Sequence, residues 1–144
     1  MPSVKEYLDT GIQEHLSGLV QEKRLEKVKE EAYREEASVD YKSENILIRI
    51  VSEYGGIRIE IAPTKDKDKF FAVDMIAELL SPDLYKGKPG LVRLSLADQV
   101  NLLRKNWDQF QVLYSPETYG AETKKRLKDL DEKRTSKVLP KTWK

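Results

Sequence analysis

The chain has 144 residues, 35% of them charged, and its 26 lysines and arginines nearly balance its 25 aspartates and glutamates. This length predicts a single domain with a sizeable core, and the balanced charge excludes the strong overall field that draws a protein to nucleic acid or acidic lipid. The lack of cysteine excludes disulfides, thiolate chemistry and cysteine zinc sites.

The first predicted element is a helix over residues 3–36. Ser3 and Glu6 have the spacing of a capping box. An apolar stripe then recurs at helical spacing at Val4, Leu8, Ile12, Leu16 and Leu19. From residue 21 to residue 36 the stripe thins among many opposite charges at i,i+4 spacing, which support an exposed helix. We expect this second half to lie on the surface or to project, where it is available to a second copy of the chain.

The strongest β signal is NILIRIVSEYGGIRIEIAP, residues 45–63. Isoleucines alternate with period two on both sides of Gly55 and Gly56, and this glycine pair tolerates the positive φ of a tight turn. The segment therefore predicts a β-hairpin with one isoleucine face, which we expect to be covered by helices.

The register of this hairpin has two solutions. If Ser52 pairs with Ile57, then Arg49 lies directly opposite Glu60 on the reverse face, an opposite-charge pair that favours the register. A two-residue turn at the glycine pair keeps the same faces but moves Arg49 opposite Ala62.

The rest of the chain predicts a short strand and three helices. Residues 70–73 indicate a third strand followed by a helix from Asp74 to Leu80, although the whole segment is also compatible with a helix. Turn-rich residues 81–90 end that helix. Two C-terminal helices follow, one from Ser95 to Tyr114 and one from Pro116 to about residue 134. The predicted fold is α+β, a single domain of residues 1–134 with a small antiparallel sheet of two or three strands packed against helices, and a flexible basic tail over residues 135–144.

A catalytic constellation is not recognisable in the sequence. His15, the one histidine, lies beside the apolar stripe of the first helix, which favours a core-edge position over a general base. Acidic residues 66 and 68 alternate with lysines and lack calcium-loop spacing. Asp83 with residues 122–124 imitates the carboxylates and lysine of a metal-dependent nuclease, but the second half falls in a predicted helix. We expect no enzymatic activity, no metal and no cofactor.

Two parts of the exterior are candidates for binding. The first comprises the reverse face of the hairpin, the turn-rich loop and a tryptophan near the C-terminus: Arg49, Tyr54, Arg58, Glu60, Tyr85, Lys86, Lys88 and Trp143. The second is the basic C-terminal helix and tail, with candidate nucleic-acid contacts at Lys124, Lys125, Lys128, Arg134 and Lys137. The structural alternatives are a solvated sheet face and cations that favour the helix macrodipole.

The order of YKSENILIRIV, GIRIEIAP, FFAVDMIAELL and two closing helices, residues 41–134, resembles small uncharacterised bacterial proteins. Some of these are thought to act as immunity proteins or as accessory proteins beside toxins and defence genes. The resemblance rests on hydrophobic pattern and carries no functional residue. It implies a non-enzymatic protein-binding module, an immunity-like inhibitor or small accessory subunit, with another protein such as a toxin or a larger complex as partner. Nucleic-acid binding is the alternative.

The sequence also predicts where the protein is found. No run of about 20 apolar residues is present, and the N-terminus lacks the apolar core of a signal peptide. We therefore expect a cytoplasmic protein without a membrane partner.

Overall fold

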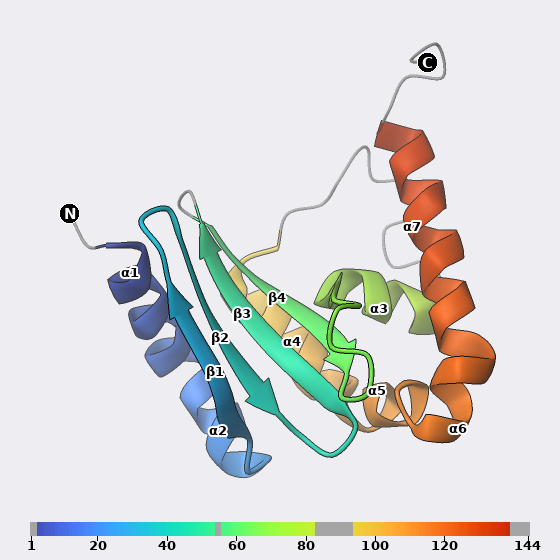
Figure 1. Cartoon of the computed structure of the whole chain (residues 1–144), viewed down its shortest axis with the longest axis horizontal. Coiled ribbons are helices and arrows are strands. Elements are labelled where there is room, and N and C mark those ends of the chain that lie inside the picture. The colour runs from blue at the N-terminus through green and yellow to red at the C-terminus, as the bar shows by residue number, and fades with distance from the viewer. Residues whose placement is uncertain (1–2, 54–55, 83–93, 139–144) are drawn as a thin grey trace.

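The fold is α+β, as the sequence predicts. The computed structural model describes the backbone of residues 3–53, 56–82 and 94–138, and side chains as far as residue 134. Five antiparallel strands form one sheet in the order β1-β2-β3-β4-β5 (Figure 1). The strands are β1 (Glu26–Ala32), β2 (Glu36–Lys42), β3 (Ile46–Glu53), β4 (Gly56–Pro63) and β5 (Phe71–Ala72).

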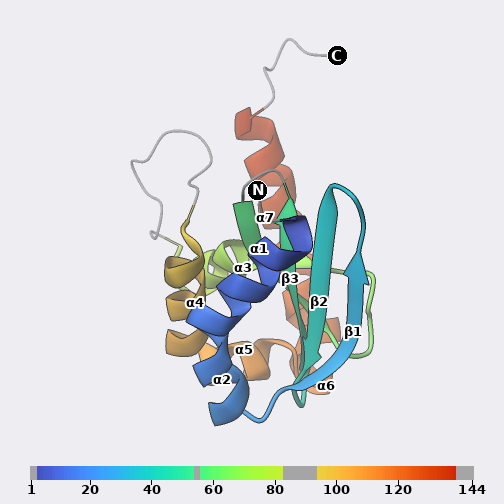
Figure 2. The same cartoon turned by 90° about the vertical axis from the view of Figure 1, so that its left-hand side faces the viewer.

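The helical segments precede and follow the sheet in the chain. They are α1 (Val4–Gly11), the π-helix η1 (Ile12–Leu16), α2 (Ser17–Glu22), α3 (Val73–Leu80), α4 (Leu96–Lys105), α5 (Trp107–Leu113), α6 (Pro116–Thr118), the π-helix η2 (Tyr119–Thr123) and α7 (Lys124–Val138). In Figures 1 and 2, α1, α2, α4 and α5 lie together on one side of the sheet. The helix α7 packs on α3, beyond the β5 edge.

The predicted hairpin and its first register are confirmed. Ser52 pairs with Ile57, and Arg49 pairs with Glu60 across β3 and β4. The alternating isoleucines face the helices, and five of them have no exposed surface: Ile46, Ile48, Ile50, Ile59 and Ile61. Burying a side chain of this size contributes about 1.5–3 kcal/mol, so this face anchors the core.

The helices on the core side also follow the predicted pattern. The side chain of Ser95 accepts a hydrogen bond from the backbone N–H of Asp98 and so caps α4. The seam from α4 into α5 is buried at Val100, Leu103, Trp107, Phe110 and Tyr114. The one change from the prediction is a break at Asn106, which divides the predicted helix into α4 and α5.

The predicted helix over residues 3–36 is wrong beyond Glu22. There the chain turns at Arg24, whose φ is 51°. The N–H groups of Arg24 and Leu25 donate to the carbonyls of Gln21 and Val20 at 3.3 and 2.9 Å. This pattern is a Schellman C-cap, which usually carries glycine at the left-handed position. With arginine there, the sequence lacks the ordinary signal for the end of a helix.

Residues 26–32 then form a strand instead of a second helical half. All their side chains are exposed except that of Glu31, which is partly buried. Charges spaced for an exposed helix suit an exposed strand equally well, and the ladder of hydrogen bonds with β2 decides between the two. The sheet therefore has five strands, where the sequence predicts two or three.

The C-terminal end differs in one respect. Helix α7 continues to Val138, four residues beyond the predicted helix end at about residue 134. Residues 139–144 lie outside the described part of the chain.

Candidate functional site

The sheet face opposite the core is the candidate binding surface, and we call it the outer face. It carries Asp40 from β2, Arg49 and Glu53 from β3, and Arg58 and Glu60 from β4. Figure 1 shows no described helix over this face, although the segment that follows β4 crosses one end of it. The face exists because strand residues alternate sides, so a strand that buries its isoleucines turns the residues between them outward.

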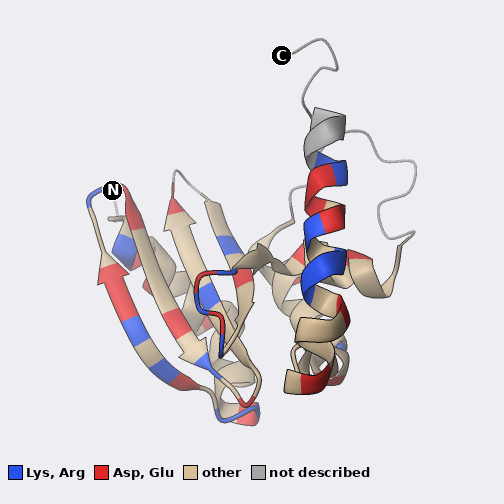
Figure 3. Cartoon of the chain, turned by 45° about the vertical axis from the view of Figure 1, so that its right-hand side comes forward, with Lys and Arg blue, Asp and Glu red and all other residues tan. Residues whose placement is uncertain are grey.

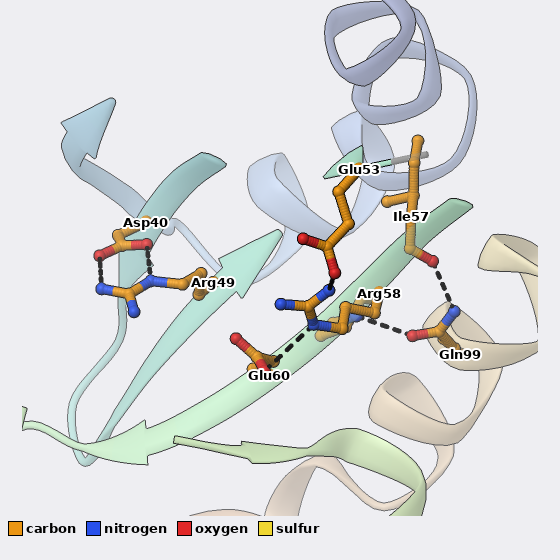
Figure 4. A network of polar contacts seen from close by, with 8 residues as sticks. Asp40, Arg49, Glu53, Ile57, Arg58, Glu60 and Gln99 are labelled. Atoms are coloured by element: carbon orange, nitrogen blue, oxygen red, sulfur yellow. Dashed lines mark hydrogen bonds and ion pairs between the residues drawn. The ribbon is translucent and has the colours of Figure 1, made fainter. Parts of the chain in front are cut away.

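Arg49 is held rigidly on the outer face. Its Nε and Nη2 donate to the two carboxylate oxygens of Asp40 at 2.9 and 3.0 Å (Figure 4). The guanidinium carbon also lies 3.9 Å from the ring centroid of Phe70, a cation–π contact. The hydrogen bonds to Asp40 raise the pKa of Arg49 above its ordinary value. The predicted opposition of Arg49 and Glu60 is confirmed as a backbone register, but the guanidinium binds Asp40 on the neighbouring strand.

Arg58 is the second fixed cation of this face. Its Nε donates to Glu60 at 3.2 Å, and its Nη1 donates to Glu53 (Figure 4). Burial by itself lowers the pKa of Arg58, but the hydrogen bond to Glu53 and the charge of Glu60 outweigh it, so the pKa is raised. The side chain remains 41% exposed. The outer face thus presents cations whose positions are set by carboxylates on the same sheet.

Gln99 of α4 completes the site from the side, although the sequence pattern does not single it out. Its Oε1 accepts from the backbone N–H of Ile59 at 2.7 Å, and its Nε2 donates to the carbonyl of Ile57 at 2.9 Å. The amide therefore takes the place of a neighbouring strand along this part of β4 (Figure 4). The signal was a polar residue on an apolar stripe, three residues after Leu96 and four before Leu103.

A hollow of about 950 Å³ adjoins the outer face at the turn end of β4. Its described lining is mixed. Tyr7, Glu14 and His15 contribute from the first helical segment, Ile57 and Arg58 from β4, and Leu96 from the start of α4. An open hollow with apolar walls and charged rims suits contact with another surface.

Arg134 also reaches this hollow, but it is bound within the chain. Its Nη1 lies 3.3 Å from Asp74, and its Nη2 lies 2.9 Å from Glu78. The guanidinium thus ties α7 to α3. This use of Arg134 favours a structural role over the predicted contact with nucleic acid.

The structure brings together only part of the predicted binding set. Arg49, Arg58 and Glu60 share the outer face. Tyr54, Tyr85, Lys86, Lys88 and Trp143 lie outside the described residues, as does the side chain of Lys137. Lys124, Lys125 and Lys128 are exposed on α7, where blue and red residues alternate along the helix in Figure 3.

A metal site and the nuclease-like set are the remaining chemical possibilities. Within residues 3–53, 56–82 and 94–134, no group of three or more His, Asp or Glu side chains is arranged to hold a metal ion. Residues 122 and 123 lie in η2 and residue 124 begins α7, so that half of the nuclease-like set is helical as predicted. Asp83 lies outside the described residues. In the described part of the chain, no helix has the length and apolar character to cross a bilayer.

A comparison with protein-family models, curated proteins and solved structures finds no match to this chain. The resemblance of residues 41–134 to immunity-type proteins therefore stays a prediction.

Proposed function

We propose that this protein is a non-enzymatic protein-binding module, an immunity-like inhibitor or small accessory subunit that contacts another protein through its outer face. The observation that carries the proposal is the pair of arginines, Arg49 and Arg58, held in place by carboxylates on a sheet face without a described covering helix. The two arginines are partly exposed, at 28% for Arg49 and 41% for Arg58. An ordered set of charges of both signs is suited to recognising a partner with the complementary pattern.

The fixed geometry favours binding for an energetic reason. Ordering a long side chain at an interface costs about 0.5–1.5 kcal/mol. Arg49 is already ordered by two hydrogen bonds and an aromatic ring, and Arg58 by two carboxylates. Folding has therefore already ordered both guanidinium groups before a partner binds. Arginine is also enriched among the residues that dominate interface energies.

The charge distribution favours a protein over a nucleic acid as the partner. The cations of the outer face are each paired with carboxylates of the same face, which weakens attraction to a polyanion. On α7, Asp129, Asp131 and Glu132 interrupt the lysines and arginines. Phosphate binding depends on uncompensated cations, so a protein surface of mixed charge is the better match.

The test uses Arg58→Ala with Lys128→Ala as the matched control, because Arg58 is a partly exposed cation of the outer face and Lys128 is an exposed cation of α7. Proteins retained by the tagged wild-type chain in cells that encode it are identified, and each binary complex is then measured with purified components by titration calorimetry. We expect Arg58→Ala to weaken the complex about tenfold or more, and Lys128→Ala to leave it unchanged.

Two results would contradict the proposal. One is a set of binary complexes whose affinities do not change in Arg58→Ala. The other is binding to duplex DNA that falls steeply with salt, weakens in Lys128→Ala and is unaffected by Arg58→Ala, which would assign the nucleic-acid function.

A further inference from the structure

The two edges of the sheet differ in how their backbone groups are paired. At one edge, β5 pairs with β4 at Glu60 and Ile61, and Gln99 occupies the backbone groups of Ile57 and Ile59. At the other edge, β1 pairs with β2 alone, and no described element lies beyond it. An exposed edge strand offers unpaired N–H and C=O groups to another strand. The described sheet is thus closed on one side and open on the other.

The open edge also carries exposed apolar side chains. Among the described residues, the large hydrophobic side chains that stay exposed are Tyr7, Val28, Tyr33 and Val112. Val28 lies in β1 at 46% exposure, and Tyr33 follows that strand at 64% exposure. Half of this set therefore gathers on the open edge or directly after it. Covering these side chains would add to any pairing of backbones there.

We propose that two copies of this chain pair antiparallel through β1 about a twofold axis at Glu30, which joins their sheets into one. A twofold axis perpendicular to the sheet pairs odd-numbered residues with odd-numbered residues and even-numbered residues with even-numbered ones. With the axis at Glu30, Lys29 of each copy lies opposite the partner's Glu31, and Val28 lies opposite the partner's Ala32. Opposite charges in directly facing positions are favourable, and this contact occurs twice.

The β-bulge in β1 selects this register. The pairing with β2 shifts by one residue between Lys27 and Lys29. On the two sides of this bulge, odd-numbered residues therefore lie on opposite faces of the sheet. An axis at Lys29 would place the two copies of Lys29 opposite each other. It would also pair Lys27 with the partner's Glu31, but their side chains would lie on opposite faces of the sheet and could not meet. The axis at Glu30 keeps both Lys29–Glu31 contacts on one face.

The one unfavourable contact at the axis is between the two Glu30 side chains. Each already has two cations close to it, since Lys5 lies 2.9 Å and Lys27 lies 3.6 Å from its carboxylate. The hydrogen bond from Lys5 and the charge of Lys27 lower the pKa of Glu30. These cations offset the repulsion across the axis.

The same charges discourage other partners. Lysines and a bulge on an edge strand prevent pairing with an arbitrary strand. A strand with the complementary pattern avoids that penalty, and a second copy in this register supplies it. The dimer uses the edge of β1 and leaves Arg49 and Arg58 accessible to a further protein. The dimer and the proposed function can therefore be tested independently of each other.

The test exchanges charges between copies. Lys29→Glu places two acids opposite each other at both contacts, and Glu31→Lys places two lysines there. We expect each variant alone to dimerise about tenfold or more weakly than wild type. An equimolar mixture of the two variants restores opposite charges at both contacts, so we expect a heterodimer with nearly wild-type affinity. Sedimentation velocity over a wide concentration range measures wild type, each variant and the mixture.

Mixing separates the proposal from a purely structural role of these residues. Lys29 and Glu31 also form an ion pair 3.0 Å long within one chain, and mixing two variants cannot repair a contact within a chain. Hydrogen exchange provides a second readout, since amides of β1 should gain protection as the wild-type concentration rises. A wild type that sediments as a monomer throughout, variants that dimerise like wild type, or a mixture without heterodimer would each overturn the proposal.

Discussion

Gln99→Leu should lower stability far more than a surface substitution of the same type. Leucine has a similar volume and keeps the helical stripe of α4, but it cannot hydrogen-bond to β4. The substitution leaves the N–H of Ile59 and the carbonyl of Ile57 without the partners that Gln99 supplies at 2.7 and 2.9 Å. It also removes the 3.1 Å hydrogen bond to the carbonyl of Leu94.

The size of the effect follows from the burial of these groups. Ile59 has no exposed surface, so its N–H bears the full cost of an unsatisfied buried donor, about 1–3 kcal/mol. Ile57 and Leu94 are only partly buried, so water recovers part of what their carbonyls lose. We expect the free energy of unfolding to fall by about 2–4 kcal/mol, a large part of the roughly 5–15 kcal/mol that holds a domain together.

The measurement is urea unfolding followed by far-UV circular dichroism and by tryptophan fluorescence, with Gln109→Leu as the control. Gln109 is exposed on α5, so the same substitution there should change stability by less than about 0.5 kcal/mol. Hydrogen exchange at the amide of Ile59 should accelerate in Gln99→Leu alone. A loss below about 1 kcal/mol, or one equal to the control, would refute the view that Gln99 replaces a strand at this edge.

Three further substitutions test local features, each by the same unfolding measurement. Arg24→Gly should raise the free energy of unfolding by about 0.5–1 kcal/mol because it relieves a φ of 51°, whereas Arg24→Ala keeps the strain and should give no gain. Tyr114→Phe should raise it by about 1 kcal/mol, since the hydroxyl is buried without a hydrogen-bond partner among the described residues and burial raises its pKa. Tyr119→Phe should not raise the free energy of unfolding, because Tyr119 is a partly buried ring stacked on Tyr114. Equal gains from the two substitutions would contradict the role given to the unsatisfied hydroxyl of Tyr114. Gly18→Ala should stabilise α2 by about 0.5–1 kcal/mol because a Cβ there meets its nearest neighbour at an ordinary 3.7 Å. Gly11→Ala places its Cβ 2.7 Å from a side-chain carbon of β4, so an equal gain there would show that this contact does not matter.

Elements defined by local contacts could be predicted from the sequence. The isoleucines of β3 and β4 alternate within one hairpin, so their shared face and register follow from neighbouring residues. Ser3 caps α1 by accepting from the N–H of Glu6, and Ser95 caps α4 in the same way. The two caps span three residues each, and the hairpin pairs all lie within the single segment 46–63.

The candidate site was predictable only in part. Arg49 and Arg58 could be placed on the outer face because alternation along a strand is local. The hydrogen-bond partner of Arg49 could not be predicted. It is Asp40 of β2, and the hairpin pattern does not specify that β2 lies beside β3. Gln99 meets β4 from 40 residues away in the chain, and only the packed structure reveals its role.

The sequence by itself determined the α+β class, the buried isoleucine face and the helices closing it. Tertiary structure decided that residues 26–32 form a strand. In a helix the backbone hydrogen bonds join residues four apart, so a periodic pattern reports them. In a strand they join two separate segments, here β1 and β2 across residues 33–35, so no period within β1 alone reports them. The charges of β1 fit either state, and its pairing with β2 selects one.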